Sequence, residues 1–410
     1  MSRKLVVLSM IILSGLTGLT GSLAQAETDV RPVQMTLSQF LAKVRGQNLD
    51  LKIESSKVKA ADAKAIGLSI PSPMAELMRT RDSGGVANGY VISQTIPFPT
   101  KLWGDQGARK SEARAQSEIK EIRENEILAQ ARFLYFSLWE SQEKLSILEE
   151  KKKILLSHIK LSRSSARSDS FAGIHVLKAE SDLDFLENET SSEEQSLKQK
   201  QAEISAYINE DILITQVVAV EPPLSEIPKI NSVEETPQFK SIRFALDSFK
   251  SRELEADSSW LPDFTLRYKN MGPSNMAVGY SEVGIGFTVP FLFFWEPYSI
   301  SRQAGAQRLQ SEYELEKQSR LIHAEQESLR NGLNSLKKQL TLLKEKLIPR
   351  AEKRMHLVHN LAPRDMETLQ DHRETMESFP DLKMKALELR RQYEQTLAAL
   401  EKYQPRREIR

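Results

Sequence analysis

The stretch DFTLRYKNMGPSNMAVGYSEVGIGFTV, residues 263–289, decides the fold. Apolar and polar side chains alternate on either side of a segment rich in Gly, Pro and Asn at 270–275, which predicts a β-hairpin. One face of this hairpin is apolar and consists of Phe264, Leu266, Tyr268, Val283, Ile285, Phe287 and Val289. The opposite face carries small or polar side chains, among them Arg267, Lys269 and Glu282.

An apolar face opposite a polar face is typical of a strand that contacts lipid on one side and a water-filled lumen on the other. We therefore predict that the apolar set faces lipid and that Arg267, Lys269 and Glu282 line a lumen. A soluble hairpin packed against helices would show the same alternation, so this hairpin alone does not separate the two interpretations.

A second hairpin is predicted upstream, at 74–96, although its alternation is poorer. The segments TIPF at 95–98 and TVPF at 288–291 lie 193 residues apart, and each is followed by a tryptophan, Trp103 or Trp295. The same order of elements surrounds both copies: a helix, a hairpin, a long helix and a return helix. The chain is therefore interpreted as an internal repeat.

Pro97 and Pro290 mark the points where the predicted hairpins end, because proline cannot donate a hydrogen bond to a strand ladder. Aromatic residues lie beside both points: Phe98, Trp103, Phe291, Phe293, Phe294 and Trp295. Such residues form belts at membrane interfaces, but they could also form a dry core where helices meet the sheet. Their position next to the strand ends favours the belt for the second cluster.

Most of the remaining chain is predicted to form very long helices. Between 106 and 162 there is no proline, and apolar side chains recur in a 4-3 alternation from Ile127 to Ile159. Similar seams run through 329–347 and 382–403, and 174–207 has a helical composition. A helix of about 57 residues is roughly 85 Å long. Helices of this length favour a duct of antiparallel helices over a globular domain.

The predicted organisation has four parts. Residues 1–26 form a signal peptide, with Arg3 and Lys4 before an apolar run and a small-x-small site at 24–26. The alternative, a membrane anchor, requires a longer apolar run. The first structural repeat spans 27–216, a proline-containing linker expected on the outside spans 217–236, and the second repeat spans 237–410.

Composition excludes several functional classes. The 410 residues include no cysteine and carry a formal charge of +1, which excludes disulfides and thiol chemistry and argues against nucleic-acid binding. No catalytic constellation stands out, so we expect neither enzymatic activity nor a cofactor. Met355, His356, His359, Met366 and Met376 lie near one another in sequence, but two histidines do not make a site, and no metal site is expected.

Several motifs resemble the TolC-like outer-membrane efflux protein family. Residues 36–39 (TLSQ) with 48–51 (NLDL) are similar to the opening helix of the family, and 92–102 (ISQTIPFPTKL) to its strand-exit motif. The latter form resembles the heavy-metal branch, the CusC/CzcC-like channels. Residues 176–183 (VLKAESDL) and 348–352 (IPRAE) resemble the starts of later helices. The resemblance covers essentially the whole mature chain.

The resemblance implies a mainly α fold with a small β part. Long antiparallel helices would form a trimeric α-barrel, and two hairpins per chain would contribute to a shared 12-stranded outer-membrane β-barrel. The function implied is that of a passive exit duct in the outer membrane that extends into the periplasm. Its partners would be two further copies, a periplasmic adaptor, an inner-membrane efflux pump and outer-membrane lipid. Cation efflux would fit the heavy-metal branch.

Charged residues around the two helix–helix turns are the candidate working residues of such a duct. They are Arg163, Arg167, Asp169, Arg364, Asp365, Glu367 and Asp371. Because both long helices start at a strand exit, both turns are expected at the same distant, periplasmic end. Repeated around an axis, these charges could form a gating constriction; they could equally be solvated helix ends.

A second class of function stays open. A periplasmic coiled-coil adaptor or scaffold without channel activity would also contain long antiparallel helices. An adaptor usually has one helical hairpin rather than two, together with a β-rich lipoyl-like domain that is not recognisable here. Retention in the outer membrane after a salt wash would distinguish a channel from either alternative.

Overall fold

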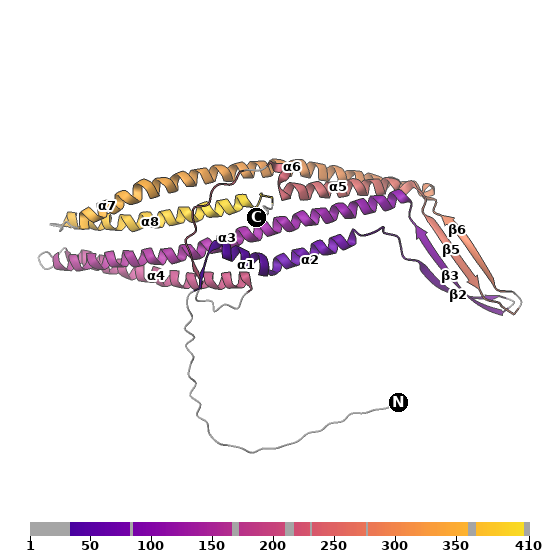
Figure 1. Ribbon diagram of the computed structural model, residues 1–410, viewed down its shortest axis with the longest axis horizontal. Coiled ribbons are helices and arrows are strands. Elements are labelled where there is room, and N and C mark those ends of the chain that lie inside the picture. Colours follow the sequence, from indigo (N-terminus) through magenta and orange to yellow (C-terminus); the bar gives the residue numbers. More distant parts are fainter. Residues whose placement is uncertain are drawn as a thin grey trace, which may run out of the picture.

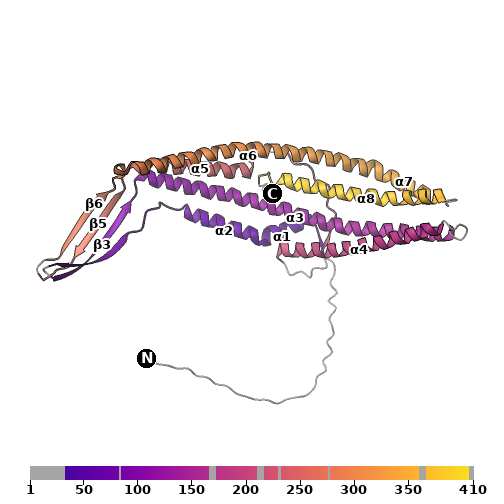
Figure 2. The ribbon, with the colours of Figure 1, turned by 180° about the vertical axis from the view of Figure 1, so that it is seen from behind.

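The computed structural model describes residues 33–82, 85–165, 172–209, 217–229, 232–275, 278–359 and 366–405. Long antiparallel helices form an extended bundle, and a single sheet projects from one end of it (Figures 1 and 2). The predicted fold class, mainly α with a small β part, is confirmed. In the described part of the chain, no helix combines the length and the apolar character needed to cross a membrane.

The first half of the chain contains helices that flank a hairpin. Its elements are β1 (Val33–Met35), α1 (Leu37–Gln47), α2 (Leu49–Lys64), β2 (Met74–Asp82), β3 (Gly85–Ile96), α3 (Pro99–Ser165) and α4 (Ala172–Ile208). The hairpin matches the predicted span 74–96. The long helix α3 is longer than its predicted core of 106–162, because it begins directly after the proline-containing strand exit.

The second half repeats this order. Its elements are β4 (Val217–Ala219), α5 (Pro237–Asp257), β5 (Phe264–Met271), β6 (Tyr280–Phe287), α6 (Trp295–Leu342), α7 (Ile348–His359) and α8 (Met366–Glu401). Short 3₁₀ segments occupy Val233–Glu235, Ser258–Trp260 and Pro290–Phe293.

Local chemistry explains several boundaries in the opening helices. Thr36 caps α1 with a reciprocal capping box, in which its hydroxyl accepts from the backbone N–H of Gln39 and the Gln39 side chain accepts from the backbone N–H of Thr36. The Asn48 side chain caps α2 by accepting from the N–H groups of Asp50 and Leu51. The Asn48 cap explains why the opening helix divides in two at that residue.

The predicted seam at 329–347 crosses an irregularity. A π-helical turn at Leu343–Leu347 separates α6 from α7. Pro349 lies two residues after this turn; it has no N–H to donate to the Glu345 carbonyl, and its ring would crowd that group in a regular α-helix. The wider turn accommodates the proline, so the helix continues in the same direction.

The two hairpins join into one antiparallel sheet with the strand order β2-β3-β5-β6. The join pairs β3 with β5, with Ile92 opposite Tyr268 and Ile96 opposite Phe264. The prediction that Val289 lies on the apolar strand face is wrong. β6 ends at Phe287, opposite Phe264; one further backbone hydrogen bond, from the Thr288 N–H to the Asp263 carbonyl, follows, and Pro290 lies just beyond it. Val289 therefore lies outside the sheet and is half-buried.

The helical seams form two main cores. In one, the Ile127–Tyr135 face of α3 packs with α1 and with Ile204 and Ile208 of α4. In the other, Leu333 and Leu340 of α6 pack against Leu389, Tyr393 and Leu397 of α8. The coiled-coil seams predicted for α3, α6 and α8 therefore correspond to buried contacts between neighbouring helices.

The linker predicted at 217–236 contains no helix from 217 to 229 and a 3₁₀ turn at Val233–Glu235, but it does not run wholly outside. Its first residues form β4, which pairs in parallel with β1, and Val217 is fully buried. The Tyr135 hydroxyl lies 2.8 Å from the Met35 carbonyl oxygen and 2.7 Å from that of Val220. The start of the linker is thus built into the first core.

Candidate functional site

The apolar face of the sheet is exposed. The register places Phe264 opposite Phe287, Leu266 opposite Ile285 and Tyr268 opposite Val283, all on one face. The first hairpin extends this face with Leu77, Tyr90 and Ile92. Val283 and Ile285 are 75% and 74% exposed. An apolar surface of this extent is typical of an interface with lipid or with another protein.

Over β5 and β6 the opposite face carries mainly polar or small side chains, as the alternation predicted. Arg267 lies opposite Gly284 and Lys269 opposite Glu282, and the Lys269 ammonium lies 5.4 Å from the centre of the Tyr280 ring. The register adds Glu76 and Ser93 to this face. Sequence analysis did not identify these two residues, because the alternation of the first hairpin is weak and only the pairing with β5 shows which way its side chains point.

One glycine permits the join between the hairpins. A Cβ atom on Gly89 would lie 2.3 Å from the Asn270 carbonyl oxygen and 2.4 Å from the Met271 sulfur. Only glycine therefore fits where β3 passes β5. An isolated glycine inside a strand pattern is the sequence signal that could have revealed this close approach.

Both strand exits meet at one carboxylate, that of Asp263. Its Oδ1 accepts from the backbone N–H of Phe98 at 3.0 Å and from the Lys101 ammonium at 2.8 Å. The Asp263 N–H donates to the Thr288 hydroxyl at 2.8 Å. Asp263 thus fastens the beginning of α3 to the start of β5 and to the end of the second hairpin. Local periodicity gave no sign of this role.

The helices below the sheet also approach closely. A Cβ atom on Gly104 would lie 2.8 Å from the Glu255 backbone nitrogen, and one on Gly107 would lie 2.9 Å from the Ser251 hydroxyl. Small residues on α3 therefore let α5 pack directly against its backbone. Arg109 of α3 reaches the end of α2, where it donates to the Lys64 carbonyl at 2.7 Å.

The aromatic residues at the second strand exit are exposed. Phe293, Phe294 and Trp295 are 58%, 61% and 58% exposed, and their rings contact one another edge to face. At the first exit, Phe98 stacks on Phe264, and Trp103 is 62% exposed. The second cluster therefore forms no dry core within the chain, which supports its interpretation as a membrane-interface belt.

The end of α3, which carries Arg163, and the start of α8, which carries Asp371, lie at the end of the bundle opposite the sheet (Figure 1). Arg167, Asp169, Arg364 and Asp365 lie outside the described residues, and Glu367 is in the first turn of α8 without a described side chain. Arg163 pairs with Glu180 at 2.5 Å. Asp371 is exposed. The structure thus brings none of the seven candidates into contact with another in the described part of the chain.

An arginine that the sequence analysis missed joins the two repeats near this end. Arg373 of α8 contacts Asp182 of α4 at 2.6 Å and Glu377 at 2.9 Å. Burial opposes the charge of Arg373, but hydrogen bonds and charges from Glu377 and Asp182 outweigh it and raise the pKa of Arg373. Helical periodicity shows which face a charge occupies, but it does not show that α4 and α8 are neighbours.

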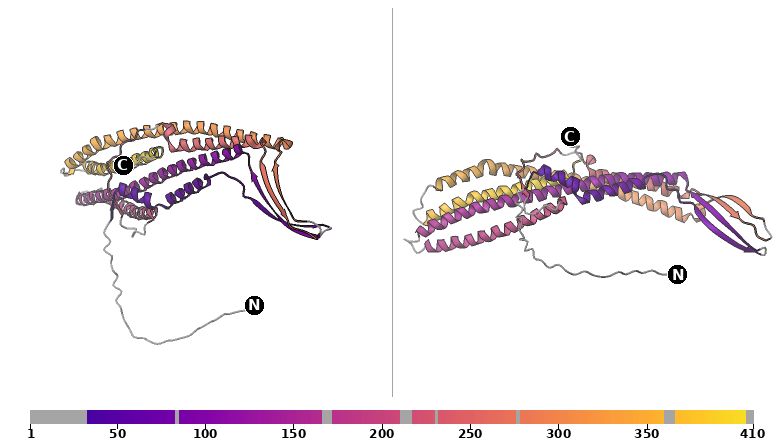
Figure 3. Two further views of the ribbon diagram at one scale, coloured as in Figure 1. Left: turned by 45° about the vertical axis from the view of Figure 1, so that its right-hand side comes forward. Right: turned by 60° about the horizontal axis from the view of Figure 1, so that its bottom comes forward.

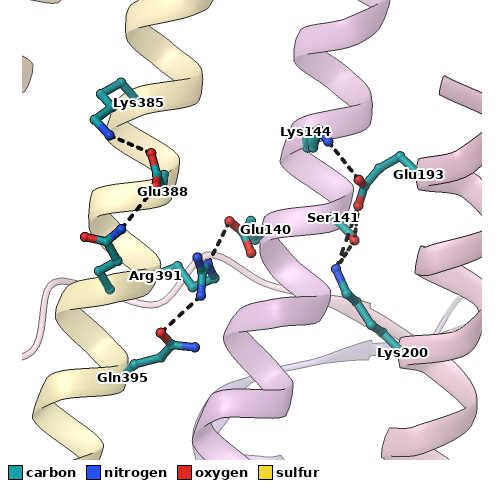
Figure 4. Close-up of polar contacts among 10 residues, drawn as sticks. Glu140, Ser141, Lys144, Glu193, Lys200, Lys385, Glu388, Arg391 and Gln395 are labelled. Carbon is teal, nitrogen blue, oxygen red and sulfur yellow. Dashed lines mark hydrogen bonds and ion pairs between the residues drawn. The ribbon is translucent and has the colours of Figure 1, made fainter. Parts of the chain in front are cut away.

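Further ion pairs connect α3 with α8 along their length. Arg391 contacts Glu140 at 2.9 Å (Figure 4), and Lys383 contacts Glu150 at 2.8 Å. Two more pairs, Lys151–Asp381 at 2.5 Å and Arg132–Glu401 at 2.5 Å, complete the set. These charges join the first repeat to the second through side chains alone.

Within the first repeat, a polar cluster joins α3 to α4 (Figure 4). Lys144 lies 3.1 Å from both Glu189 and Glu193, and the Ser141 hydroxyl donates to Glu193. Burial raises the pKa of Glu193, but the Ser141 hydrogen bond and the charges of Lys144 and Lys200 outweigh it and leave that pKa below its ordinary value. Glu193 is therefore held in its charged form.

A buried ion pair fixes the linker. Arg390 and Glu394 of α8 lie 3.0 Å apart with side chains 4% and 0% exposed. The Arg390 guanidinium also donates to the carbonyl oxygens of Pro222 and Pro223. Burial raises the pKa of Glu394 and lowers that of Arg390. This pair holds the proline-containing segment against α8.

Of the residues considered for metal binding, the structure describes the side chains of three: Met355, His356 and Met376. His356 is exposed, and Met376 is buried; the His359 and Met366 side chains lie outside the described residues. In the part of the chain that the structure describes, no three His, Cys, Asp or Glu side chains come together to hold a metal ion.

Comparison with known proteins identifies the fold. No family model and no curated protein sequence matches this chain. Among solved structures, CusC aligns with a TM-score of 0.74 at 13% identity, over 92% of this chain and 94% of that chain. The open-state outer-membrane channel MtrE of Neisseria gonorrhoeae aligns with a TM-score of 0.72 at 14% identity, over 90% and 88%.

A third match is the outer-membrane channel CmeC of Campylobacter jejuni, with a TM-score of 0.69 at 14% identity over 90% of this chain and 85% of that chain. All three alignments span nearly the whole length of both partners. The chain therefore has the fold of these channels, including that of CusC, and the TolC-like architecture predicted from the sequence is confirmed.

Proposed function

We propose that this protein is the outer-membrane exit duct of a tripartite efflux system. It passively conducts substrates that a periplasmic adaptor and an inner-membrane pump deliver to it. The observation that carries the proposal is the exposed apolar face of the sheet, which is opposed by a polar face and lies at the end of a helical bundle. The shared fold with known outer-membrane channels supports the same conclusion.

The proposed active form is a homotrimer. One chain supplies four strands to this sheet, and β2 and β6 each have one edge without a partner among the described residues. An unpaired strand edge is not tolerated in lipid, because its N–H and C=O groups would lack hydrogen bonds. Three chains would join these edges into a closed barrel of twelve strands, with the helices continuing into the periplasm.

Two neighbouring positions on β6 test the assignment to the membrane. Ile285→Lys places a charge on the apolar face and should cost about 2–4 kcal/mol at mid-depth in the bilayer. Gly284→Lys is the matched control, since Gly284 is on the polar face and no atom lies within 4 Å of a Cβ placed there. We expect only Ile285→Lys to reduce the amount of protein retained in salt-washed outer membranes.

Channel activity separates this proposal from a scaffold or adaptor. The purified protein should form discrete conductance steps in planar bilayers and should run as a trimer in mild detergent. A protein that a salt wash releases from the membrane and that gives no conductance would be a periplasmic adaptor or scaffold instead.

We further propose that the distal helix ends narrow the duct. Arg163 and Asp371 lie there in the structure, and the remaining candidates belong to or flank the same two turns. Replacing both Asp365 and Asp371 with Ala should change single-channel conductance or cation selectivity. Glu316→Ala is the control, because Glu316 is an exposed residue of α6 that pairs with Arg320 of the same helix. Unchanged conductance in the double variant would place the constriction elsewhere.

A further inference from the structure

The apolar face of the sheet carries charged residues at one place only, on β2 toward the end of the sheet that lies farthest from the helices (Figure 3). The register assigns to this face the odd-numbered residues 75–81 of β2 and 281–287 of β6, and the even-numbered residues 86–96 of β3 and 264–270 of β5. In these described strands, the set contains no Asp, Glu or Lys and two arginines, Arg79 and Arg81. The opposite face, in contrast, carries charges of both signs.

Both arginines are open to an external ligand. Arg79 lies opposite Asn88 and Arg81 opposite Val86, and all four residues are exposed. Neither arginine forms an ion pair with another residue that the structure describes. Because they are two residues apart on one strand, they project from the same face about 7 Å from each other. The pair is therefore a concentrated positive charge beside an apolar surface.

The height of the pair matches the outer margin of a membrane. Asn88, opposite Arg79, lies eight residues before the strand exit at Ile96, and Val86, opposite Arg81, lies ten residues before it. At about 3.4 Å per residue and a tilt of about 40°, these separations correspond to roughly 21 Å and 26 Å along the membrane normal. The apolar band of an outer-membrane barrel is about 25 Å tall. The arginines therefore lie where this band ends.

The other two strands mark the same margin. Asn270 of β5 and Ser281 of β6 lie opposite each other on the apolar face, one row of side chains closer to the helices than Arg79. The Asn270 amide lies 2.9 Å from the Ser281 hydroxyl, and the Tyr268 hydroxyl lies 3.3 Å from it. Apolar side chains thus give way to polar ones at this level, which is expected where hydrocarbon meets lipid headgroups.

We propose that Arg79 and Arg81 bind the phosphate groups of a phosphorylated lipid in the outer leaflet of the outer membrane. The inference rests on the proposed channel, whose helices extend into the periplasm and so direct this end of the sheet outward. A guanidinium group presents paired donors that match the oxygens of a phosphate. Clusters of basic side chains at a membrane surface bind anionic headgroups in the same way.

A lipid is the ligand that fits, because one molecule can satisfy both parts of this surface. Its phosphate groups would contact the arginines, and its acyl chains would cover the apolar side chains closer to the helices. Leu77, two residues before Arg79 on the same face, is 91% exposed, and Tyr90 opposite it is 40% exposed. A free phosphate ion would occupy the charges but leave this apolar surface uncovered.

A binding measurement on the full protein tests the pair. The protein is immobilised in neutral detergent with EDTA, so that no divalent cation bridges the lipid to a carboxylate, and is titrated with fluorescent diphosphoryl lipid A. Each arginine near an anionic lipid surface contributes about a fivefold factor in affinity, so the variant with Arg79→Gln and Arg81→Gln should bind about 25-fold more weakly.

The matched control combines Arg267→Gln with Lys269→Gln. It also removes two positive charges that are two residues apart on one strand, but from the opposite face of the same sheet. Its affinity for diphosphoryl lipid A should equal that of the natural protein. An equal loss in both variants would show that the lipid responds to the total charge of the sheet, and the inference would be overturned.

Two further arms hold even if the glutamine variant does not assemble. Lipid A freed of its phosphate groups, with the same acyl chains, should bind the natural protein about 25-fold more weakly than the diphosphoryl form. The variant with Arg79→Lys and Arg81→Lys keeps the charge but loses the paired donors, and its affinity should be intermediate. Equal binding of both lipids would mean that acyl chains alone carry the interaction, and this result would also overturn the inference.

Competition and conductance separate the remaining outcomes. An excess of inorganic phosphate should not displace the lipid; displacement would assign the arginines to a free anion instead. Undiminished lipid binding by a glutamine variant that still conducts would remove the lipid site and leave the channel standing. A natural protein that neither conducts nor stays in salt-washed outer membranes would overturn the proposed function itself, and the lipid site with it.

Discussion

The two repeats meet at both ends of the molecule, but by different means. At the sheet end, β3 and β5 exchange backbone hydrogen bonds, and Gly89 lets them approach without a side chain between them. Toward the distal end, side-chain ion pairs such as Lys383–Glu150 and Arg373–Asp182 connect α8 to α3 and α4. One junction is therefore built from backbone hydrogen bonds, and the other from side chains, namely ion pairs together with the apolar contact of Leu387 of α8 in the first core.

This difference has a mechanical consequence. Backbone hydrogen bonds in a sheet fix the register, and a slip by one residue would turn every side chain to the opposite face. Partly exposed ion pairs contribute only about 0–1 kcal/mol each and weaken with salt. The sheet end is therefore the fixed end of the molecule, and the distal end can rearrange at low cost. A gate would be expected at the end that can rearrange.

The largest effect should follow from a methyl group at the fixed junction. Gly89→Ala would place Cβ within 2.4 Å of both Asn270 and Met271, so β3 and β5 must separate. Overpacking of this kind costs typically 1–3 kcal/mol and occasionally more. We expect a lower unfolding temperature of the protein, measured by its heat stability on semi-native gels.

The matched control is Gly284→Ala, on the same polar face of the sheet but with open space around the new methyl group. It should leave the heat stability nearly unchanged. Equal stability of both variants would mean that the β3–β5 approach tolerates a side chain, and the contrast between the two junctions would lose its main support.

A smaller effect is expected from the carboxylate that joins the strand exits. Asp263→Ala removes the hydrogen bonds with Phe98 and Lys101, and losing hydrogen bonds to a charged group costs about 1.5–3 kcal/mol. Asp381→Ala is the control, because Asp381 also pairs with a lysine, Lys151, but is 59% exposed. Denaturant unfolding should show a loss at least twofold larger for Asp263→Ala.

The sequence predicted features that depend on local pattern. Alternation placed both hairpins, with the first at its observed bounds, and the 4-3 seams predicted which helix faces are buried. The polar and apolar faces of β5 and β6 were also predicted correctly apart from Val289. That error arose because the alternation continues for two residues beyond the end of the partner strand.

The features that the sequence did not reveal depend on partners far apart in the chain. Asp263, Gly104 and Arg373 acquire their roles from contacts more than 140 residues away. No local periodicity reports such contacts. The functional roles of the predicted lumen and tip residues also depend on neighbouring copies of the chain, so they remain predictions.

The smallest expected effect concerns a charged residue of the helical bundle, Glu193 of α4. The folded-state pKa of Glu193 lies below its ordinary value of 4.5, so its contribution to stability is present above pH 4.5 and is lost as the pH falls below that value. Glu193→Gln should therefore lower stability by about 1 kcal/mol or less at pH 7, and the loss should be smaller at pH 3.5. The adjacent Glu194→Gln should have little effect at either pH, because Glu194 is exposed and has no ion pair within the described chain. Urea unfolding at the two pH values measures both variants. Equal losses at pH 7 and pH 3.5 for Glu193→Gln would show that Glu193 acts through packing rather than charge. Packing would then help to hold the distal half together, and the contrast with the sheet end would be weaker.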